Sequence, residues 1–185
     1  MIINSIQKRR TPIFSIIISA YNVENYLTEC LNSLISQTIG FSENVEVIIV
    51  DDHSTDKTLV IAESFVSKYP NNIKVFKNIK EGVSSARNEG INIATGKYFN
   101  FLDADDYLEK NCLENIYNFF EERQKEIDLV SIPMIRFGSQ SGQHMLNDKF
   151  KADWIINTEQ TPDYIQLSSS SSFIKSELFK DKRYR

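Results

Sequence analysis

The chain has 185 residues, 41% of them hydrophobic and 25% charged, which is enough for one compact domain with a core of its own. Its formal net charge of −4 argues against general nucleic-acid binding, because that function needs a basic surface. The two cysteines, Cys30 and Cys112, form no CxxC pair and have no histidine cluster nearby. Two buried thiols are therefore expected, rather than a disulfide framework or a structural zinc site.

The N-terminal apolar run follows the basic residues 8–10, but it lacks a small-residue cleavage site and is too short to span a bilayer. It instead predicts a buried strand over residues 14–19. We therefore expect a cytoplasmic protein, for which peripheral contact with a membrane stays open.

Strands and helices are predicted to alternate along the first 135 residues. Apolar runs rich in β-branched residues predict buried strands, and apolar residues at helical spacing predict the helices between them. After the strand 14–19, the first helix is predicted by the stripe of Leu27, Cys30, Leu31, Leu34 and Ile35. The elements that follow are a strand over 45–50, a helix from 55 that ends before Pro70, a strand over 73–78, a short helix over 84–95, a strand over 97–102, a helix over 108–122 and a strand over 128–135.

Turn and cap residues mark several of these ends. Ser54 or Thr55 is expected to cap the helix that begins at 55, and Gly96 to be the first residue beyond the helix 84–95. His53 is expected at a turn position where positive φ is useful.

The pattern weakens after residue 135. Residues 137–150 predict a polar loop or hairpin, and 154–156 predict a short strand. The serine run 168–172 is the only low-complexity element, and it is too short to be an independent linker. After it we expect a strand that enters a helix capped by Ser176.

The alternation predicts an α/β fold with a mainly parallel sheet and helices on both faces. In such sheets, ligands bind beyond the carboxyl ends of the strands. Polar residues follow four of the predicted strands, namely Tyr21 and Asn22, Asp51 and Asp52, the turn 79–85, and the run 103–106. All four groups are therefore expected to converge on one edge of the sheet.

Three carboxylates, those of Asp103, Asp105 and Asp106, occur within four positions. They repel one another, so clustering them does not stabilise the fold. An Asp-x-Asp at a strand end offers hard oxygen ligands on a short loop, which suit Mg²⁺ or Mn²⁺, with water and substrate phosphate oxygens completing the shell. The alternative is a solvated acidic turn that caps the following helix.

The residues after the first two strands can bind a nucleoside. Asp51 or Asp52 could accept a hydrogen bond from the N3–H of a uracil or from a ribose hydroxyl. Tyr21 offers a ring for a base to stack on, and Asn22 an amide to pair with it. The alternatives are that Asp52 and Ser54 cap the helix at 55, and that Asn22 caps a helix at 23.

The turn before the helix 84–95 can approach a phosphate. Gly82 allows a close backbone approach, and Arg87 lies on the first helical turn, where a guanidinium could meet a phosphate or a base carbonyl. The alternative for Arg87 is an ordinary surface arginine.

Other chemistries lack their motifs. His53 and His144 have no serine or cysteine nucleophile spaced around them, so a hydrolase triad is not expected. Neither a Gly-x-Gly-x-x-Gly nor a Walker sequence occurs, which argues against nicotinamide cofactors and P-loop chemistry.

Residues 12–38, 45–58 and 81–108, taken together, resemble glycosyltransferase family 2, which has the Rossmann-like GT-A fold, and the similarity covers about residues 11–135. The resemblance implies a nucleotide-sugar donor, usually a UDP-sugar, a divalent metal and inverting transfer to a polysaccharide, surface-polymer or lipid-linked acceptor. His53 departs from the family, where many relatives have glycine, and a local turn adjustment is expected.

The resemblance also assigns residues. Ala20, Tyr21, Asp51 and Asp52 correspond to the nucleoside pocket, and Gly82 and Arg87 to donor contacts. Asp103-Ala104-Asp105 corresponds to the metal-binding Asp-x-Asp, with Asp105 as the usual direct ligand and Asp103 toward the ribose or donor sugar.

The resemblance implies that the general base lies beyond Arg185, because relatives place it in an acidic motif well after the Asp-x-Asp. Residues 1–135 are then the nucleotide-sugar-binding core, and 136–185 the start of a truncated acceptor-side region, distantly similar to transferases that build bacterial surface polymers such as teichoic acids. One alternative is a non-catalytic module that holds a nucleotide sugar. Another is a sugar-phosphate nucleotidyltransferase, against which the absence of glycine in residues 20–27 argues.

Overall fold

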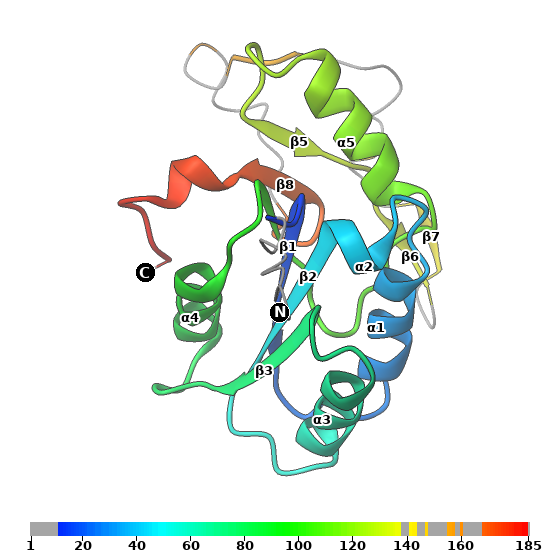
Figure 1. Cartoon of the computed structure of the whole chain (residues 1–185), viewed down its shortest axis with the longest axis vertical. Helices are drawn as coiled ribbons and strands as arrows, with labels where there is room; N and C mark the ends of the chain where they lie inside the picture. Colours follow the sequence, from blue (N-terminus) through cyan, green and yellow to red (C-terminus); the bar gives the residue numbers. More distant parts are fainter. Residues whose placement is uncertain are drawn as a thin grey trace, which may run out of the picture.

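A six-stranded sheet forms the centre of the molecule. The computed structural model describes residues 11–137, 141–143, 147, 155–157, 160 and 168–184. The strand order is β3-β2-β1-β4-β8-β5, in which the first four strands are parallel to one another and β8 runs antiparallel to both of its neighbours (Figure 1). The strands are β1 (Phe14–Ala20), β2 (Val45–Asp51), β3 (Ile73–Lys77), β4 (Tyr98–Phe101), β5 (Leu129–Ser131) and β8 (Ser172–Lys175).

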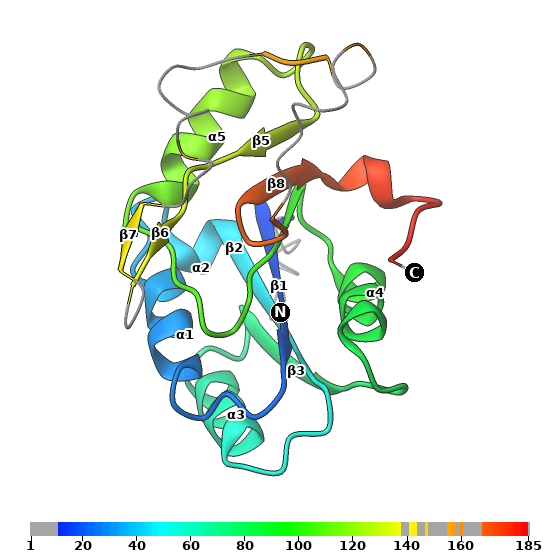
Figure 2. The same cartoon turned by 180° about the vertical axis from the view of Figure 1, so that it is seen from behind.

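Helices cover both faces of this sheet, as Figures 1 and 2 show. Side chains alternate along β1, so that Phe14, Ile16 and Ile18 pack in the core beneath one set of helices while Ile17 packs on the other face. The first face carries α1 (Leu27–Ile35), α3 (Thr58–Lys68) and α5 (Cys112–Glu122), and the second carries α4 (Val83–Ile93). The predicted α/β architecture is therefore confirmed. A short helix, α2 (Phe41–Asn44), precedes β2.

Several element ends differ from the prediction. α5 begins at Cys112 rather than 108, because the backbone before it is held against α1 and the residues that follow α1. The Leu108 N–H donates to Ser33 Oγ at 3.2 Å, and the Gln37 side-chain amide donates to the Glu109 carbonyl at 2.8 Å. The strand predicted over 128–135 is split into β5 and the first strand of a hairpin, β6 (Ile135–Arg136) with β7 (Gly142–Gln143). This pairing confirms the hairpin alternative for the described part of 137–150.

The C-terminal segment also differs in part. A strand does follow the serine run, but the helix after it is a single 3-10 turn, Ser176–Phe179, without a side-chain cap. Residues 155 and 156 are not in a strand, and Trp154 lies outside the described residues, as does His144.

The predicted caps of α3 and α4 are wrong. α3 begins at Thr58, whose N–H donates to Asp56 Oδ1 at 2.9 Å, so neither Ser54 nor Thr55 caps it. Gly96 does not end α4 in a left-handed conformation; it is needed because a Cβ there would lie 2.6 Å from the backbone nitrogen of Ser15. The expectation for His53 is confirmed, with φ at 65°.

Both cysteines are free; Cys30 is buried and Cys112 is only partly buried. Burial raises the pKa of both thiols, that of Cys112 to about 12, so both stay protonated at neutral pH. In the part of the chain that the structure describes, no helix has the length and apolar character needed to cross a membrane.

Candidate functional site

The carboxyl ends of the four parallel strands meet at one edge of the sheet. Ala20 at the end of β1 pairs with Asp51 at the end of β2, and the Asp52 N–H donates to the Ala20 carbonyl at 2.8 Å. β4 lies on the other side of β1 and ends at Phe101, which pairs with Ile17. Asp51 and the loop after β4 are thus two strands apart, about 10 Å at the usual strand spacing.

Asn22 joins the loops after β1 and β2. Its N–H donates to Ser54 Oγ at 3.1 Å, and its side-chain oxygen accepts from the Thr55 N–H at 2.8 Å. Asn22 has φ at 51°, a left-handed conformation that asparagine tolerates. Because α1 begins at Leu27, Asn22 caps no helix at 23, and its carbonyl oxygen is already used within the protein. The neighbouring Tyr21 ring is 60% exposed and free to stack.

The adjacent carboxylates of Asp51 and Asp52 lie in different environments. Asp52 accepts from the Gly82 N–H at 2.9 Å and from the Asn78 amide at 2.7 Å, so it holds the turn before α4 rather than a cap at 55. Asp51 is only 2% exposed, and its Oδ1 is buried with no hydrogen-bond partner among the residues that the structure describes. A buried carboxylate oxygen without a donor is costly. Asp51 is therefore the carboxylate that still needs a hydrogen-bond donor.

Gly82 sits directly before α4 in a conformation that favours glycine, with φ at 118°. This conformation points its N–H at Asp52, and an added Cβ would meet nothing within 4 Å. The backbone here is open on the side where a side chain would lie, as the expected close approach requires.

Arg87 is not the surface arginine of the alternative interpretation. Its side chain is only 16% exposed, and its Nη2 donates to Asp103 Oδ1 at 3.1 Å and to Ser169 Oγ at 2.9 Å. The guanidinium lies 5.3 Å from the ring centroid of Tyr184. Burial raises the pKa of the Tyr184 phenol, so the ring stays neutral beneath the cation.

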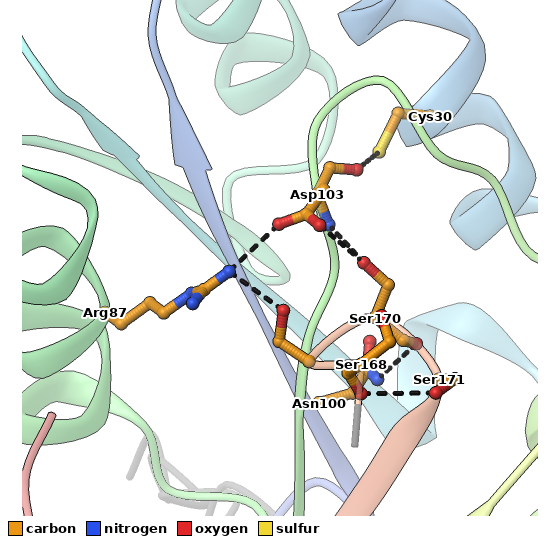
Figure 3. Close-up of polar contacts among 8 residues, drawn as sticks. Cys30, Arg87, Asn100, Asp103, Ser168, Ser170 and Ser171 are labelled. Atoms are coloured by element: carbon orange, nitrogen blue, oxygen red, sulfur yellow. Dashed lines mark hydrogen bonds and ion pairs between the residues drawn. The ribbon is translucent and has the colours of Figure 1, made fainter. Parts of the chain in front are cut away.

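Both carboxylate oxygens of Asp103 are engaged, as Figure 3 shows. Oδ1 pairs with Arg87, and Oδ2 accepts from Ser170 Oγ at 2.9 Å. On the other side of the backbone, Cys30 Sγ lies 4.0 Å from the Asp103 carbonyl oxygen. Asp103 is thus fixed in orientation although its side chain is 43% exposed.

The acidic loop, residues 103–106, also contains one buried alanine and two further aspartates. Ala104 is 3% exposed and packs in the core, which fixes the loop between its two neighbours. Asp105 is exposed and has no hydrogen bond or ion pair to any described residue. Burial and the charges of Asp105 and Asp103 raise the pKa of Asp106.

The loop does not form a complete metal site by itself. Over the described ranges, no group of three or more His, Cys, Asp and Glu side chains is arranged to hold a metal ion. The reason is visible at Asp103, whose oxygens face Arg87 and Ser170. The donor set suits a hard divalent cation only through Asp105 together with oxygens from water and a bound phosphate.

Sequence reasoning missed three residues at this edge, Ser169, Ser170 and Tyr184. They lie 82 to 97 positions from Arg87 along the chain, and no local pattern connects them with it. The serine run itself was the one available signal.

A sheet of this topology, with acidic and basic side chains gathered beyond the ends of its parallel strands, is the GT-A fold of nucleotide-sugar transferases. A sequence model of glycosyl transferase family 2 matches residues 15–176. The chain belongs to this family.

Several characterised proteins are similar to it. The minor teichoic acid biosynthesis protein GgaB of Bacillus subtilis is 46% identical over 171 residues, which cover 92% of this chain and 19% of GgaB. The crystal structure of S. aureus TarS in complex with UDP has a TM-score of 0.77 and 33% identity, covering 91% of this chain and 48% of that one. The complex of TarS with UDP-GlcNAc has a TM-score of 0.75 and 34% identity, covering 91% of this chain and 46% of that one.

TarS of Staphylococcus aureus is a poly(ribitol-phosphate) beta-N-acetylglucosaminyltransferase, 31% identical over 168 residues, which cover 91% of this chain and 28% of TarS. The chain thus spans less than half the length of each of these relatives.

Proposed function

We propose that this chain binds the donor in a metal-dependent, inverting transfer of a sugar from a UDP-sugar to a surface-polymer acceptor. The observation that carries the proposal is the buried Oδ1 of Asp51, which has no partner among the described residues and lies at the same sheet edge as Asp105, for which those residues also supply none. The binding of UDP and UDP-GlcNAc by TarS supports a uridine donor, and the polymer named for TarS supports an acceptor of the teichoic-acid class.

Each proposed donor contact is assigned to a group at this edge of the sheet. Asp51 Oδ1 accepts from the uracil N3–H, which supplies the missing donor, and the exposed Tyr21 ring stacks on the base beside Ala20. Gly82 lets the donor approach the backbone, and Arg87 supplies positive charge next to Asp103, which we assign to the ribose or sugar side of the donor. Asp52 holds the turn at Gly82 in place by accepting a hydrogen bond from its N–H.

We assign the cation, Mn²⁺ or Mg²⁺, to the Asp-x-Asp, with Asp105 as the direct ligand and Asp103 as the second acidic residue of the motif. When bound, the cation neutralises the diphosphate and stabilises it as a leaving group. Asp105 alone offers too few ligands for a stable site, so we expect the ion to bind together with the nucleotide. The protein's own part is to hold one carboxylate free and to keep its neighbour Asp103 turned toward Arg87.

Inversion requires a base that deprotonates the acceptor hydroxyl as it attacks the anomeric carbon. No residue of this chain is assigned that role; we place the base beyond Arg185. On this view, residues 1–135 form the donor-binding core and 136–185 begin the acceptor side. We place the protein in the cytoplasm, where nucleotide sugars are available, with a peripheral membrane contact still open.

Thermal unfolding with UDP and Mn²⁺ tests the donor site. At 100 times the dissociation constant a ligand adds about 2.7 kcal/mol to the free energy of unfolding, so Tm should rise by about 5–10 °C when both are present. Asp105→Ala should abolish the part of this rise that depends on Mn²⁺. Glu109→Ala, an exposed acid on the same loop, should leave it intact.

A Mn²⁺-dependent rise that survives in Asp105→Ala would show that the metal assignment is wrong. Transfer or donor hydrolysis by this chain would exclude the alternative of a non-catalytic binding module.

A further inference from the structure

The serine segment, residues 168–172, lies at the same sheet edge as the acidic loop. β8 runs antiparallel to β4, so the segment that enters β8 arrives where β4 ends. Ser170, Ser171 and Ser172 are at most 5% exposed. A buried serine contributes little hydrophobic free energy, and its hydroxyl must be hydrogen-bonded, so the partners of these hydroxyls show what the segment does.

Ser170 contacts Asp103 at two points. Its hydroxyl donates to Asp103 Oδ2 at 2.9 Å and accepts from the Asp103 N–H at 3.2 Å. One small side chain thereby fixes both the backbone and the carboxylate of the same residue. A serine hydroxyl can do this because it is both a donor and an acceptor.

Ser169 contacts the other partner of Asp103. Its Oγ accepts from Arg87 Nη2 at 2.9 Å, while the same nitrogen donates to Asp103 Oδ1 at 3.1 Å. The guanidinium is thus held between a carboxylate and a hydroxyl. A single ion pair with a 43% exposed carboxylate would leave both side chains rotational freedom, which the two serines remove.

The serine segment is itself held in place by hydrogen bonds to β4 and within the segment. The buried Asn100 amide in β4 donates to the carbonyls of Ser170 at 3.0 Å and Ser172 at 2.9 Å. The hydroxyl of Ser171 donates to the Ser168 carbonyl at 3.2 Å (Figure 3). The interior of the sheet therefore fixes the backbone from which Ser169 and Ser170 reach the two charged groups.

We propose that Ser169 and Ser170 are positioning residues, which hold the guanidinium of Arg87 and the carboxylate of Asp103 in the donor-binding orientation before the nucleotide arrives. The inference rests on the proposed donor site. Its physical basis is preorganisation, because groups that are already oriented lose less conformational entropy when the ligand binds. With Asp103 held in this way, Asp105 stays free for the cation.

Calorimetric titration of UDP, with and without Mn²⁺, tests this role. Ser170→Ala removes a hydrogen bond to a charged group and should weaken UDP binding in the presence of Mn²⁺ by about tenfold. Ser169→Ala should weaken it by about threefold, because Arg87 keeps Asp103 as a partner. The matched control is Ser171→Ala, which removes an equally buried hydroxyl that contacts neither charged group and should change the affinity by less than about twofold.

Two further measurements separate positioning from a loss of structure. Ser170→Cys keeps the side-chain shape but is a weak donor, so it should lose affinity in the same direction while keeping the wild-type Tm within a few degrees. In an Asp103→Asn background, Ser170→Ala should have a smaller effect than in the wild type, because the contact with the carboxylate is already lost and only the contact with the backbone N–H of residue 103 is left to remove.

Equal losses in Ser170→Ala and Ser171→Ala, or an undiminished effect of Ser170→Ala in the Asp103→Asn background, would overturn the positioning role alone. A wild-type chain that binds no UDP with Mn²⁺ would overturn the proposed donor site, and this role with it.

Discussion

The four parallel strands and the antiparallel pair β8 and β5 are held in the same sheet by different means. β1 and β2 are buried along almost their whole length, on both faces, with apolar side chains on each. β5 is only half-buried throughout, and β8 has one large buried side chain, that of Phe173. Its other links to the parallel strands are polar, through Asn100 and the serine segment.

The two parts of the sheet therefore contribute to the candidate site in different ways. The parallel strands fix the position of Asp51, at the end of β2, and of the segments that lead to Asp103 and to Arg87 in α4, because their carboxyl ends lie at one edge. The antiparallel pair does not supply a candidate donor contact of its own, but it brings Ser169 and Ser170 against Arg87 and Asp103. The parallel strands therefore place the site, and the antiparallel pair orients its charged groups.

The largest expected effect tests whether the antiparallel pair belongs to the same core. Phe173 is fully buried and packs edge-on against Phe14 of β1, with ring centroids 5.9 Å apart. Phe173→Ala leaves a cavity and should lower the free energy of unfolding by about 4 kcal/mol in a single urea transition followed by circular dichroism. Leu178→Ala, at a 38% exposed position, is the control and should cost much less. A separate early transition in Phe173→Ala would show instead that β8 unfolds independently of the parallel strands.

A smaller effect, dependent on pH, is expected within the parallel strands. Glu46 is 6% exposed and accepts from Ser15 Oγ at 2.6 Å, the Thr95 N–H at 2.6 Å and Lys74 Nζ at 3.3 Å. Burial by itself raises the pKa of Glu46, but these donors outweigh it and the pKa is lowered. Glu46→Gln should cost about 2 kcal/mol at pH 7.

The lowered pKa fixes the direction of the pH effect. The stabilisation by the Glu46 carboxylate is fully present above the unfolded-state pKa of about 4.3 and is lost as the pH falls through the lower folded-state pKa. Urea midpoints of wild type and Glu46→Gln should therefore differ most near pH 7 and approach each other below about pH 4. Glu63→Gln, an exposed change in α3, should show no such convergence. A gap that stays constant down to acid pH would mean that Glu46 is not preferentially ionised in the folded protein.

The sequence allowed the sheet and its binding edge to be predicted for a physical reason. The runs that form β1, β2 and β4 are apolar on both faces, and strands buried on both faces belong to parallel sheets. Once the strands are parallel, the loops that hold Tyr21, Asp51 and Asp103 must meet at one edge.

What the sequence did not reveal depends on contacts between distant residues. Asp51 and Asp52 are the same residue type in adjacent positions, and contacts with Asn78 and Gly82, 26 and 30 residues beyond Asp52, distinguish them. The roles of Ser169 and Ser170 depend on partners 82 and 67 residues away. Likewise, the position of Gly96 in the sequence is typical of a helix end, but glycine is needed there because the backbone of Ser15 lies too close for a side chain.

The smallest expected effect lies at the outer side of the antiparallel pair. Lys175 Nζ is 3.0 Å from Asp128 Oδ1, but Asp128 is 67% exposed, so water screens most of the attraction. Lys175 keeps a second acceptor, the Gln124 carbonyl at 2.8 Å, if the carboxylate is lost. Asp128→Asn should therefore lower the free energy of unfolding by no more than about 0.5 kcal/mol in urea denaturation, and added salt should remove the difference. A loss comparable to that of Phe173→Ala would mean that polar surface contacts hold β8 in the sheet as strongly as the buried Phe173 does.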